Sequence, residues 1–364
     1  MDDARPAMPN ASFDVPAATS AGPMLHDEIA VLPVLSVLAD GAPRSRTVLA
    51  SLAGVSEPQA ESVLRLLADC GDALRCTGDR VQWHAAFIPL SEERIVHALG
   101  GPRAWHVRVA GIVDSTNSAL LREARAGVPF VTPCLLAAEL QHTGRGRQGR
   151  AWRSSPGASL TASYALTIAR GIGALSGLSL VCGLAVRDVL AARGVVAQLK
   201  WPNDVLVDGK KLAGVLIEAH PLHAQASVAV IGVGINVAPP ATRESDGNRT
   251  TSADINAIDL HTAGVPHVDR NLLAIDLASA LALRLARFTA DGFGAFQSEW
   301  NAAHAFRDRP VDLSEAGRAL SSGIARGVDA MGRLLLDTPG GAHAVLAGDV
   351  SLRPRLRPHT AAAI

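Results

Sequence analysis

Apolar residues recur at helical spacing in the first part of the chain. One helix is predicted from residue 26 to about residue 38. Two more are predicted on either side of a break at Gly54, because apolar side chains there recur at intervals close to three and four: Leu49, Leu52, Val55, Val63, Leu66 and Leu67. The following stretch, LRCTGDRVQWHAAF, predicts a β-hairpin that turns at residues 77–79. This order of elements is typical of a winged helix-turn-helix domain, expected here at residues 26–90.

From residue 91 onward, alternating strand patterns precede helical ones. Single strands are predicted in HVRVAGIV, CLLAAEL, ASLTASYALTIA and SVAVIGVGINVA. Residues 195–219 predict two strands around a turn at 207–211, and residues 175–193 predict an apolar helix. Together these patterns predict an α+β fold class, with a domain at residues 91–305 whose mixed sheet is covered by helices on one side.

The two ends of the chain have other patterns. Residues 306–357 contain short strands and glycine-rich turns, which are typical of a small β-barrel. Residues 1–25 begin with acids and lack an apolar core, so we expect a disordered tail and not a signal peptide.

Composition and charge exclude several classes of function. The chain has 364 residues and a formal net charge of zero, so bulk charge does not predict binding to nucleic acid or to a membrane. Its most apolar stretch is interrupted by Arg187 and Asp188, which excludes a membrane span there. The cysteines form no CxxC pair, so neither a zinc site nor a disulfide framework is predicted, and reduced thiols in the cytoplasm are expected: Cys70, Cys76, Cys134 and Cys182.

The segment GRGRQGRAWR, residues 144–153, is the strongest candidate for a ligand-binding loop. No Asp or Glu occurs from residue 140 to residue 187. Glycine lets the backbone approach a ligand, and arginine offers paired donors to phosphate or carboxylate, here from Arg145, Arg147, Arg150 and Arg153. The loop therefore suits a polyanion such as a nucleoside triphosphate, although it lacks the P-loop pattern. A disordered basic loop is the alternative.

Two further motifs lie at strand ends. DSTNS, residues 114–118, offers donors and acceptors for a compact polar ring, or only a helix cap from Ser115 or Thr116. GVGIN, residues 232–236, would let a flat ligand lie against the backbone while Asn236 reaches a carbonyl or phosphate; its glycines would equally permit close strand packing.

All the lysines of the chain lie in the segment KWPNDVLVDGKKLAG: Lys200, Lys210 and Lys211. Lysine is a compact point charge, whereas arginine is a planar fork. A site that needs a small cation beside one reacting oxygen would require lysine. A charged turn between two strands is the alternative.

The winged helix offers four residues that could contact DNA: Arg44, Arg46, Gln59 and Arg65. Its second helix begins, however, with Glu57, Pro58 and Glu61, and acidic side chains there oppose contact with phosphates. Binding to an operator stays open at this point.

In this order, DSTN, GRGRQGR-W, KWPND, KLAG and GVGIN resemble the motifs of the catalytic domain of biotin protein ligases. With the helix-turn-helix, the chain resembles the bifunctional biotin ligase and biotin-operon repressor of bacteria from about residue 30 to residue 357. The resemblance implies a central mixed-sheet domain of the biotin/lipoate ligase type and an SH3-like C-terminal barrel. It also implies that biotin is activated with MgATP to biotinyl-adenylate and transferred to one lysine of a biotin carboxyl carrier protein. The acidic SEPQAE departs from the more basic second helix of the family.

The resemblance also implies roles for individual residues. The catalytic residues would be Lys200, Lys211, Arg147 and Asp204. Asp204 would in addition assist Mg²⁺, with Asn203 beside it. Biotin would be held by Ser115, Thr116, Asn117, Gln141, Arg145, Gly146, Arg147, Lys211 and Gly234. The nucleotide would be held by Arg147, Arg150, Trp152, Lys200, Asn203 and Asn236.

Two other functions stay open from the sequence. A lipoate ligase shares the fold and the activation chemistry, and a ligand-sensing transcription factor could lack catalysis altogether. A homodimer and operator DNA stay open as partners, and no membrane partner is expected. The sequence assigns no role to the insertion at residues 239–264.

Overall fold

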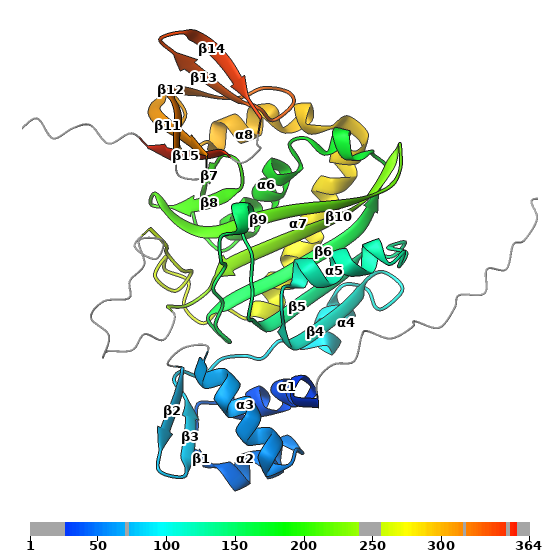
Figure 1. Ribbon diagram of the computed structural model, residues 1–364, viewed down its shortest axis with the longest axis vertical. Coiled ribbons are helices and arrows are strands. Elements are labelled where there is room, and N and C mark those ends of the chain that lie inside the picture. Colours follow the sequence, from blue (N-terminus) through cyan, green and yellow to red (C-terminus); the bar gives the residue numbers. More distant parts are fainter. Residues whose placement is uncertain (1–25, 70–72, 240–255, 316–317, 347–349, 355–364) are drawn as a thin grey trace, which may run out of the picture.

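The computed structural model describes residues 26–69, 73–239, 256–315, 318–346 and 350–354. The expected tail at residues 1–25 and most of the 239–264 insertion lie outside these ranges. The predicted α+β class is confirmed. A helical N-terminal part, a central mixed sheet with its helices and a C-terminal antiparallel sheet follow one another along the long axis of the molecule (Figure 1).

The N-terminal part consists of three helices and a small sheet. The helices are α1 (His26–Leu38), α2 (Arg46–Ala53) and α3 (Glu57–Asp69), and the strands are β1 (Arg44–Ser45), β2 (Leu74–Thr77) and β3 (Arg80–Trp83). The Ser45 hydroxyl accepts a hydrogen bond from the Val48 N–H at the start of α2, and Gly54 ends this helix with a φ of 65°. The predicted helix break at Gly54 and the hairpin turn at residues 77–79 are therefore confirmed.

Helix α1 packs against the edge of the central sheet. Val31 lies so close to Gly111 that a Cβ at position 111 would be 2.7 Å from the Val31 Cβ. Ile112 and Leu140 of the sheet belong to the same buried cluster as the core of the N-terminal part. The helix-turn-helix is thus joined to the sheet by apolar contact as well as by the chain.

The central sheet has seven strands in the order β4–β5–β6–β10–β9–β8–β7. Their bounds are β4 (His106–Val113), β5 (Cys134–Gln141), β6 (Ser159–Ile168), β7 (Gln198–Lys200), β8 (Asp204–Val207), β9 (Lys210–His223) and β10 (Ala226–Asn236). Strands β4 and β5 pair in parallel and the other neighbours are antiparallel, which makes the sheet mixed.

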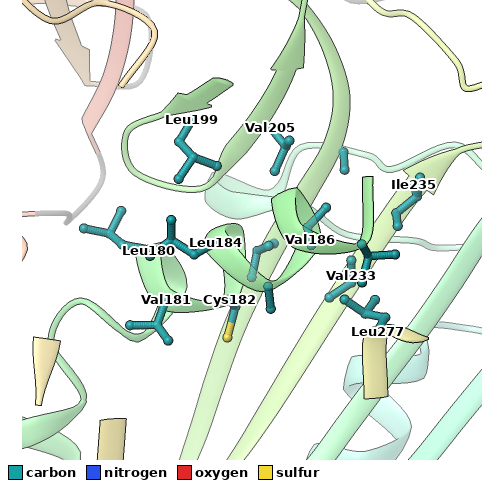
Figure 2. Close-up of a cluster of buried hydrophobic side chains, with 14 of the residues drawn as sticks. Leu180, Val181, Cys182, Leu184, Val186, Leu199, Val205, Val233, Ile235 and Leu277 are labelled. Atoms are coloured by element: carbon teal, nitrogen blue, oxygen red, sulfur yellow. The ribbon is translucent and has the colours of Figure 1, made fainter. Parts of the chain in front are cut away.

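Helices cover both faces of this sheet, so the expectation of helices on one side is wrong. Helices α6 (Leu178–Ala191) and α7 (Arg270–Asp291) pack on one face, where their apolar side chains meet those of the strands (Figure 2). The shorter α5 (Thr116–Arg125) packs on the other face against Leu136, Ala165, Val228 and Val230. Successive side chains of a strand point to opposite faces, and these strands carry apolar side chains on both. A helix on each side is therefore needed to bury them.

Residues 195–219 contribute three strands and not the predicted two. Strand β7 ends at Lys200, and the turn at residues 201–203 reverses the chain into β8. Pro202 has no N–H to donate to a strand neighbour, and this residue should have indicated the break. The turn at residues 207–211 is present as the β8–β9 hairpin.

The remaining elements frame the sheet. They are α4 (Glu92–Ala98), the 3₁₀ turns η1 (Arg147–Gly149), η2 (Ile172–Leu175) and η3 (Phe293–Phe296), and α8 (Gln297–Ala303). The C-terminal part is a five-stranded antiparallel sheet in the order β14–β13–β12–β11–β15. Its strands are β11 (Arg309–Glu315), β12 (Arg318–Val328), β13 (Leu334–Thr338), β14 (Gly341–Val345) and β15 (Val350–Pro354). No helix in the described ranges is long and apolar enough to span a bilayer.

Candidate functional site

The candidate site is a cavity of about 1220 Å³ on the face of the sheet that carries α5. Along β6 and β10 the residues on this face are apolar beneath α5, and beyond α5 they are polar residues or glycine. Ala165 and Val230 give way to Thr161, Ser163 and Gly232, which line the cavity. Because α5 is short, it leaves this part of the face uncovered.

The floor of the cavity is a network of hydrogen bonds centred on Thr116. The Thr116 N–H donates to Gln141 Oε1 at 2.8 Å, and the Thr116 hydroxyl lies 3.2 Å from the same oxygen. The Ser163 hydroxyl lies 2.7 Å from both Thr116 Oγ1 and Asn117 Oδ1. Ser115 caps α5 by accepting from the Ser118 N–H, so DSTN both begins the helix and lines the cavity. The motif can therefore present fixed donors and acceptors to a small polar ring.

The glycines of GVGIN make room for side chains from other segments. A Cβ at Gly232 would lie 2.5 Å from Asn117 Oδ1, and a Cβ at Gly234 would overlap the Trp152 ring. Asn236 donates to the backbone carbonyls of Lys211 and Ile258 at 3.4 and 3.0 Å, so it joins β9 to the described end of the insertion, residues 256–264.

Two ammonium groups share one carboxylate at the wall of the cavity. Lys211 Nζ lies 2.6 Å from Asp204 Oδ1, and Lys200 Nζ lies 3.0 Å from Asp204 Oδ2. Burial alone would raise the pKa of Asp204, but the charges of Lys211 and Lys200 together lower this pKa below its usual value. Asp204 therefore stays ionised and holds both ammonium groups at one place. Lys210 is exposed and does not line the cavity.

Residues 144–153, called the arginine loop from here on, close on themselves beside the cavity. The Trp152 N–H donates to the Gly144 carbonyl at 2.8 Å, and the Gly146 N–H donates to the Arg150 carbonyl at 2.7 Å. At its tip Gln148 has a φ of 58°, an uncommon value for a residue other than glycine. Such local strain is common at ligand-binding loops.

Side chains of this loop reach several other segments. Arg145 donates to Ser118 and Glu218, and Arg147 approaches Asn203 Oδ1 at 3.5 Å. The centre of the Trp152 ring lies 5.6 Å from Lys211 Nζ, and the buried indole Nε1–H of Trp152 has no partner within the described part of the chain. The loop and the lysine pair thus border one cavity.

The structure brings all the predicted biotin, nucleotide and catalytic residues to this one cavity. They are Ser115, Thr116, Asn117, Gln141, Arg145, Gly146, Arg147, Arg150, Trp152, Lys200, Asn203, Asp204, Lys211, Gly234 and Asn236. Two groups of lining residues were not predicted from the sequence. Thr161 and Ser163 alternate with apolar neighbours in β6, which could have indicated a polar face. Phe306, Arg309 and Arg353 come from the C-terminal part, and local pattern gave no sign of their position.

Asp204 is the acidic side chain that could serve a magnesium ion here. Within the described ranges, no group of three His, Cys, Asp or Glu side chains could hold a metal. Magnesium usually keeps several waters and takes one or two carboxylates together with substrate phosphates. One carboxylate beside Asn203 fits this mode and does not fit an all-protein cage.

The four residues predicted to contact DNA have partners inside the winged helix. Arg44 forms an ion pair with Asp40, and Arg46 Nε lies 3.0 Å from Glu61 Oε2. Gln59 Oε1 accepts from Ser56, and Arg65 Nε donates to the Glu61 carbonyl at 3.4 Å. Glu61 of α3 thus neutralises a cation that a phosphate would otherwise attract.

Comparison with known proteins connects this geometry to a family. Residues 111–236 match the model of the biotin/lipoate A/B protein ligase family, and residues 308–353 match that of the biotin protein ligase C-terminal domain. The chain is 34% identical to the bifunctional ligase/repressor BirA of Escherichia coli (strain K12), over 90% of this chain and 99% of the relative.

Two further matches agree. The chain is 35% identical to the biotin–[acetyl-CoA-carboxylase] ligase of Mycobacterium tuberculosis, over 72% of this chain and 95% of the relative. The biotin protein ligase of Aquifex aeolicus, solved in complex with biotin and ATP, aligns with a TM-score of 0.56 and 27% identity, over 69% of this chain and 99% of that one.

Proposed function

The chain belongs to the biotin protein ligases of the biotin/lipoate A/B protein ligase family, and on this premise we propose how its cavity carries out their reaction. Biotin is activated with ATP to biotinyl-adenylate, and the biotinyl group then passes to a lysine of a biotin carboxyl carrier protein. The observation that supports this best is that the arginine loop and the Lys200–Asp204–Lys211 cluster border a single cavity.

In the first step two anions have to meet. An oxygen of the biotin carboxylate attacks the α-phosphorus of ATP, a new P–O bond forms and pyrophosphate leaves. Lys211 holds the attacking carboxylate and Lys200 the α-phosphate, while Arg147 and Arg150 approach from the loop. A fixed donor aimed at developing charge typically contributes about 3–4 kcal/mol to lowering such a barrier.

The magnesium ion expected with ATP would be held by Asp204 and the phosphates, and it would supply charge neutralisation there. Asp204 also orders the two ammonium groups before the ligands arrive. Asn203 donates to the Val215 carbonyl at 2.7 Å and so fixes the turn that carries Asp204.

Selectivity for biotin is assigned to the polar floor. Thr116, Asn117 and Gln141, with Ser115 and the backbone at Gly146 and Gly234, are the proposed partners of the ureido ring. A substrate without that ring would leave buried polar groups unpaired, which can reduce kcat/KM by factors of about 10⁴. We therefore favour biotin over lipoate.

In the second step, a neutral lysine amine of the carrier attacks the mixed anhydride, an amide bond forms and AMP leaves. No nucleophile of the ligase itself is needed. The described cysteines are unpaired thiols outside the cavity, so they take no part: Cys76, Cys134 and Cys182. A cytoplasmic location belongs to this proposal, since it supplies ATP and a reducing environment.

ATP–pyrophosphate exchange tests the assignment directly. Biotin should support exchange and lipoate should not, whereas exchange driven equally by lipoate would show that the chain is a lipoate-type ligase. Lack of exchange with either acid would indicate a ligand-sensing protein without catalysis.

A second activity, repression of transcription, is supported by the winged helix and by the length of the match to BirA. We propose functional units at residues 26–90, 91–305 and 306–357. The first would contact operator DNA through Arg65, and through Arg44 and Arg46 once these leave their present partners Asp40 and Glu61. Homodimer formation would accompany this step. A gel-shift with and without biotin and ATP tests it: a shift only in their presence supports ligand-controlled binding, and none in either condition shows a ligase alone.

A further inference from the structure

Glu218 of β9 is not part of the cavity wall, yet it contacts two residues that are. Glu218 Oε2 accepts from Asn117 Nδ2 at 3.0 Å, and both carboxylate oxygens lie 3.2 Å from Arg145 Nη2. The Glu218 side chain is 23% exposed, so solvent only partly screens these contacts. One carboxylate thus joins the floor of the cavity to the start of the arginine loop.

The first contact fixes which way the Asn117 amide points. Asn117 Nδ2 donates to the Leu216 carbonyl at 3.3 Å as well as to Glu218. A carboxylate and a carbonyl can only accept, so the amide nitrogen must face them. Asn117 Oδ1 is consequently held toward the Ser163 hydroxyl and toward Gly232, which has no side chain to displace it. Rotating the amide by half a turn would place oxygen against two acceptors.

The second contact fixes the start of the loop. Arg145 Nη2 also donates to Ser118 Oγ at 2.8 Å, so Arg145 is attached to both α5 and β9. Both elements are regular secondary structure of the central domain, and β9 is an inner strand of its sheet. Charge-assisted hydrogen bonds of this kind are stronger than neutral ones.

We propose that Glu218 is a positioning residue of the biotin pocket, which orients the Asn117 amide and anchors the arginine loop through Arg145. The substrate named in this inference rests on the proposed function, whereas the contacts of Glu218 with Asn117 and Arg145 do not depend on it. Glu218 acts through these two residues and does not touch the reacting atoms. It should therefore affect binding of the acid substrate through both contacts, and binding of the nucleotide only through the position of the loop.

Steady-state exchange kinetics with Glu218→Gln test the orienting role. Loss of a charge-assisted hydrogen bond should raise the KM for biotin by about tenfold or more, with a smaller rise in the KM for ATP. The matched control is Glu123→Gln on α5, because Glu123 pairs with Arg108 outside the cavity and should leave both constants unchanged. In an Asn117→Ala background, Glu218→Gln should raise the KM for biotin less than it does alone, because only its contact with Arg145 is left to lose. Equal rises in both constants, or no change, would overturn the proposal.

Trypsin digestion of the ligand-free protein tests the anchoring role without any reliance on activity. Cleavage within residues 144–153 should be about tenfold faster in Glu218→Gln than in the unmodified protein or in Glu123→Gln, because losing the charge-assisted contact raises the open population by that factor. Unchanged cleavage would contradict the inference even if the enzyme is active. Lack of biotin-dependent exchange in the unmodified protein would instead contradict the proposed function, while the cleavage result would still decide the role of Glu218.

Discussion

Asp204 explains, at the level of single residues, why the lysines of this chain are grouped. Its two oxygens hold Lys200 and Lys211 within 3.0 Å and 2.6 Å, and the Lys211 ammonium also lies near the face of Trp152. A compact ammonium can move from the carboxylate to a substrate oxygen with a small displacement. A guanidinium would hold the carboxylate through two parallel bonds and project farther into the cavity.

Lys211→Arg should therefore keep the charge and lose most of the adenylation activity. Misplacing one donor at a developing charge typically costs about 10²-fold in kcat. Biotin-dependent pyrophosphate exchange is the measurement, and Lys210→Arg is the control, because Lys210 is exposed beside the same strand. Near-normal exchange in Lys211→Arg would show that any cation suffices at this position.

Arg147→Ala should release biotinyl-adenylate faster. Arg147 extends from the loop toward Asn203 across the cavity, and a lost charge-assisted bond of about 1.5–3 kcal/mol corresponds to about tenfold or more in dissociation rate. Dissociation of preformed adenylate measures this. A rate equal to that of the unmodified protein would argue against the loop as a lid.

At the level of elements, the most deeply buried ion pair of the described residues lies where residues 88–90, which follow the winged helix, meet the central sheet. Arg270 of α7 and Glu139 of β5 are 1% and 0% exposed and make two hydrogen bonds, of 2.7 and 3.0 Å. Arg270 also donates to the Ile88 carbonyl, and Glu139 accepts from the Leu90 N–H. The pair therefore fixes residues 88–90 against the strand that ends in Gln141 of the site.

Arg270→Met should destabilise the fold by about 3–5 kcal/mol, because it leaves the Glu139 charge buried without an opposite charge beside it. The double variant Glu139→Met/Arg270→Met should recover much of this loss, since it removes both charges. Urea unfolding compares the two. A double variant less stable than the single one would show that the linker contacts matter more than the charge pair.

His304 makes the junction between α8 and β11 sensitive to pH. It is 5% exposed, both ring nitrogens lack partners in the described residues, and its ring lies 4.8 Å from that of Trp300. Burial lowers the pKa of His304 to about 4, and the charge of Arg307 contributes, whereas Asp308 opposes the shift. Between about pH 6.5 and pH 4 the unfolded chain binds the extra proton, so this residue makes the fold less stable as pH falls.

His304→Phe should therefore reduce the loss of unfolding free energy between pH 7 and pH 5 by about 2 kcal/mol. Urea unfolding at both values measures the difference. An equal loss in the two proteins would mean that His304 is already protonated in the fold, or that water reaches it.

The sequence predicted most elements of the whole molecule and the identity of most cavity residues, because strand alternation and short polar motifs are local signals. It could not predict what depends on distant packing. Three features depend on contacts between segments far apart in the chain. They are the choice of the sheet face that α5 covers, the approach of Arg309 and Arg353 from the C-terminal part, and the contact of Glu218 with Arg145. The break at Pro202 is different, because proline indicates it locally in the sequence.

Both terminal parts of the described chain are packed onto the domain that holds the cavity. Residues of the C-terminal part line the cavity, and α1 belongs to the buried cluster that contains Leu140, the neighbour of the lining residue Gln141. Packed residues therefore connect the domain of the cavity with the winged helix, and the C-terminal part contacts the cavity directly. Coupling between ligand binding and the arrangement of these parts requires the ligand to prefer one arrangement.

Mass measurement of a biotin carboxyl carrier domain, after incubation with this protein, biotin and ATP, decides whether the cavity joins the acid to a carrier. Each carrier should gain one biotinyl group, and the gain should depend on both small molecules and be absent when the acceptor lysine of the carrier is replaced. A carrier whose mass stays unchanged with both small molecules present would show that this protein is not a biotin protein ligase.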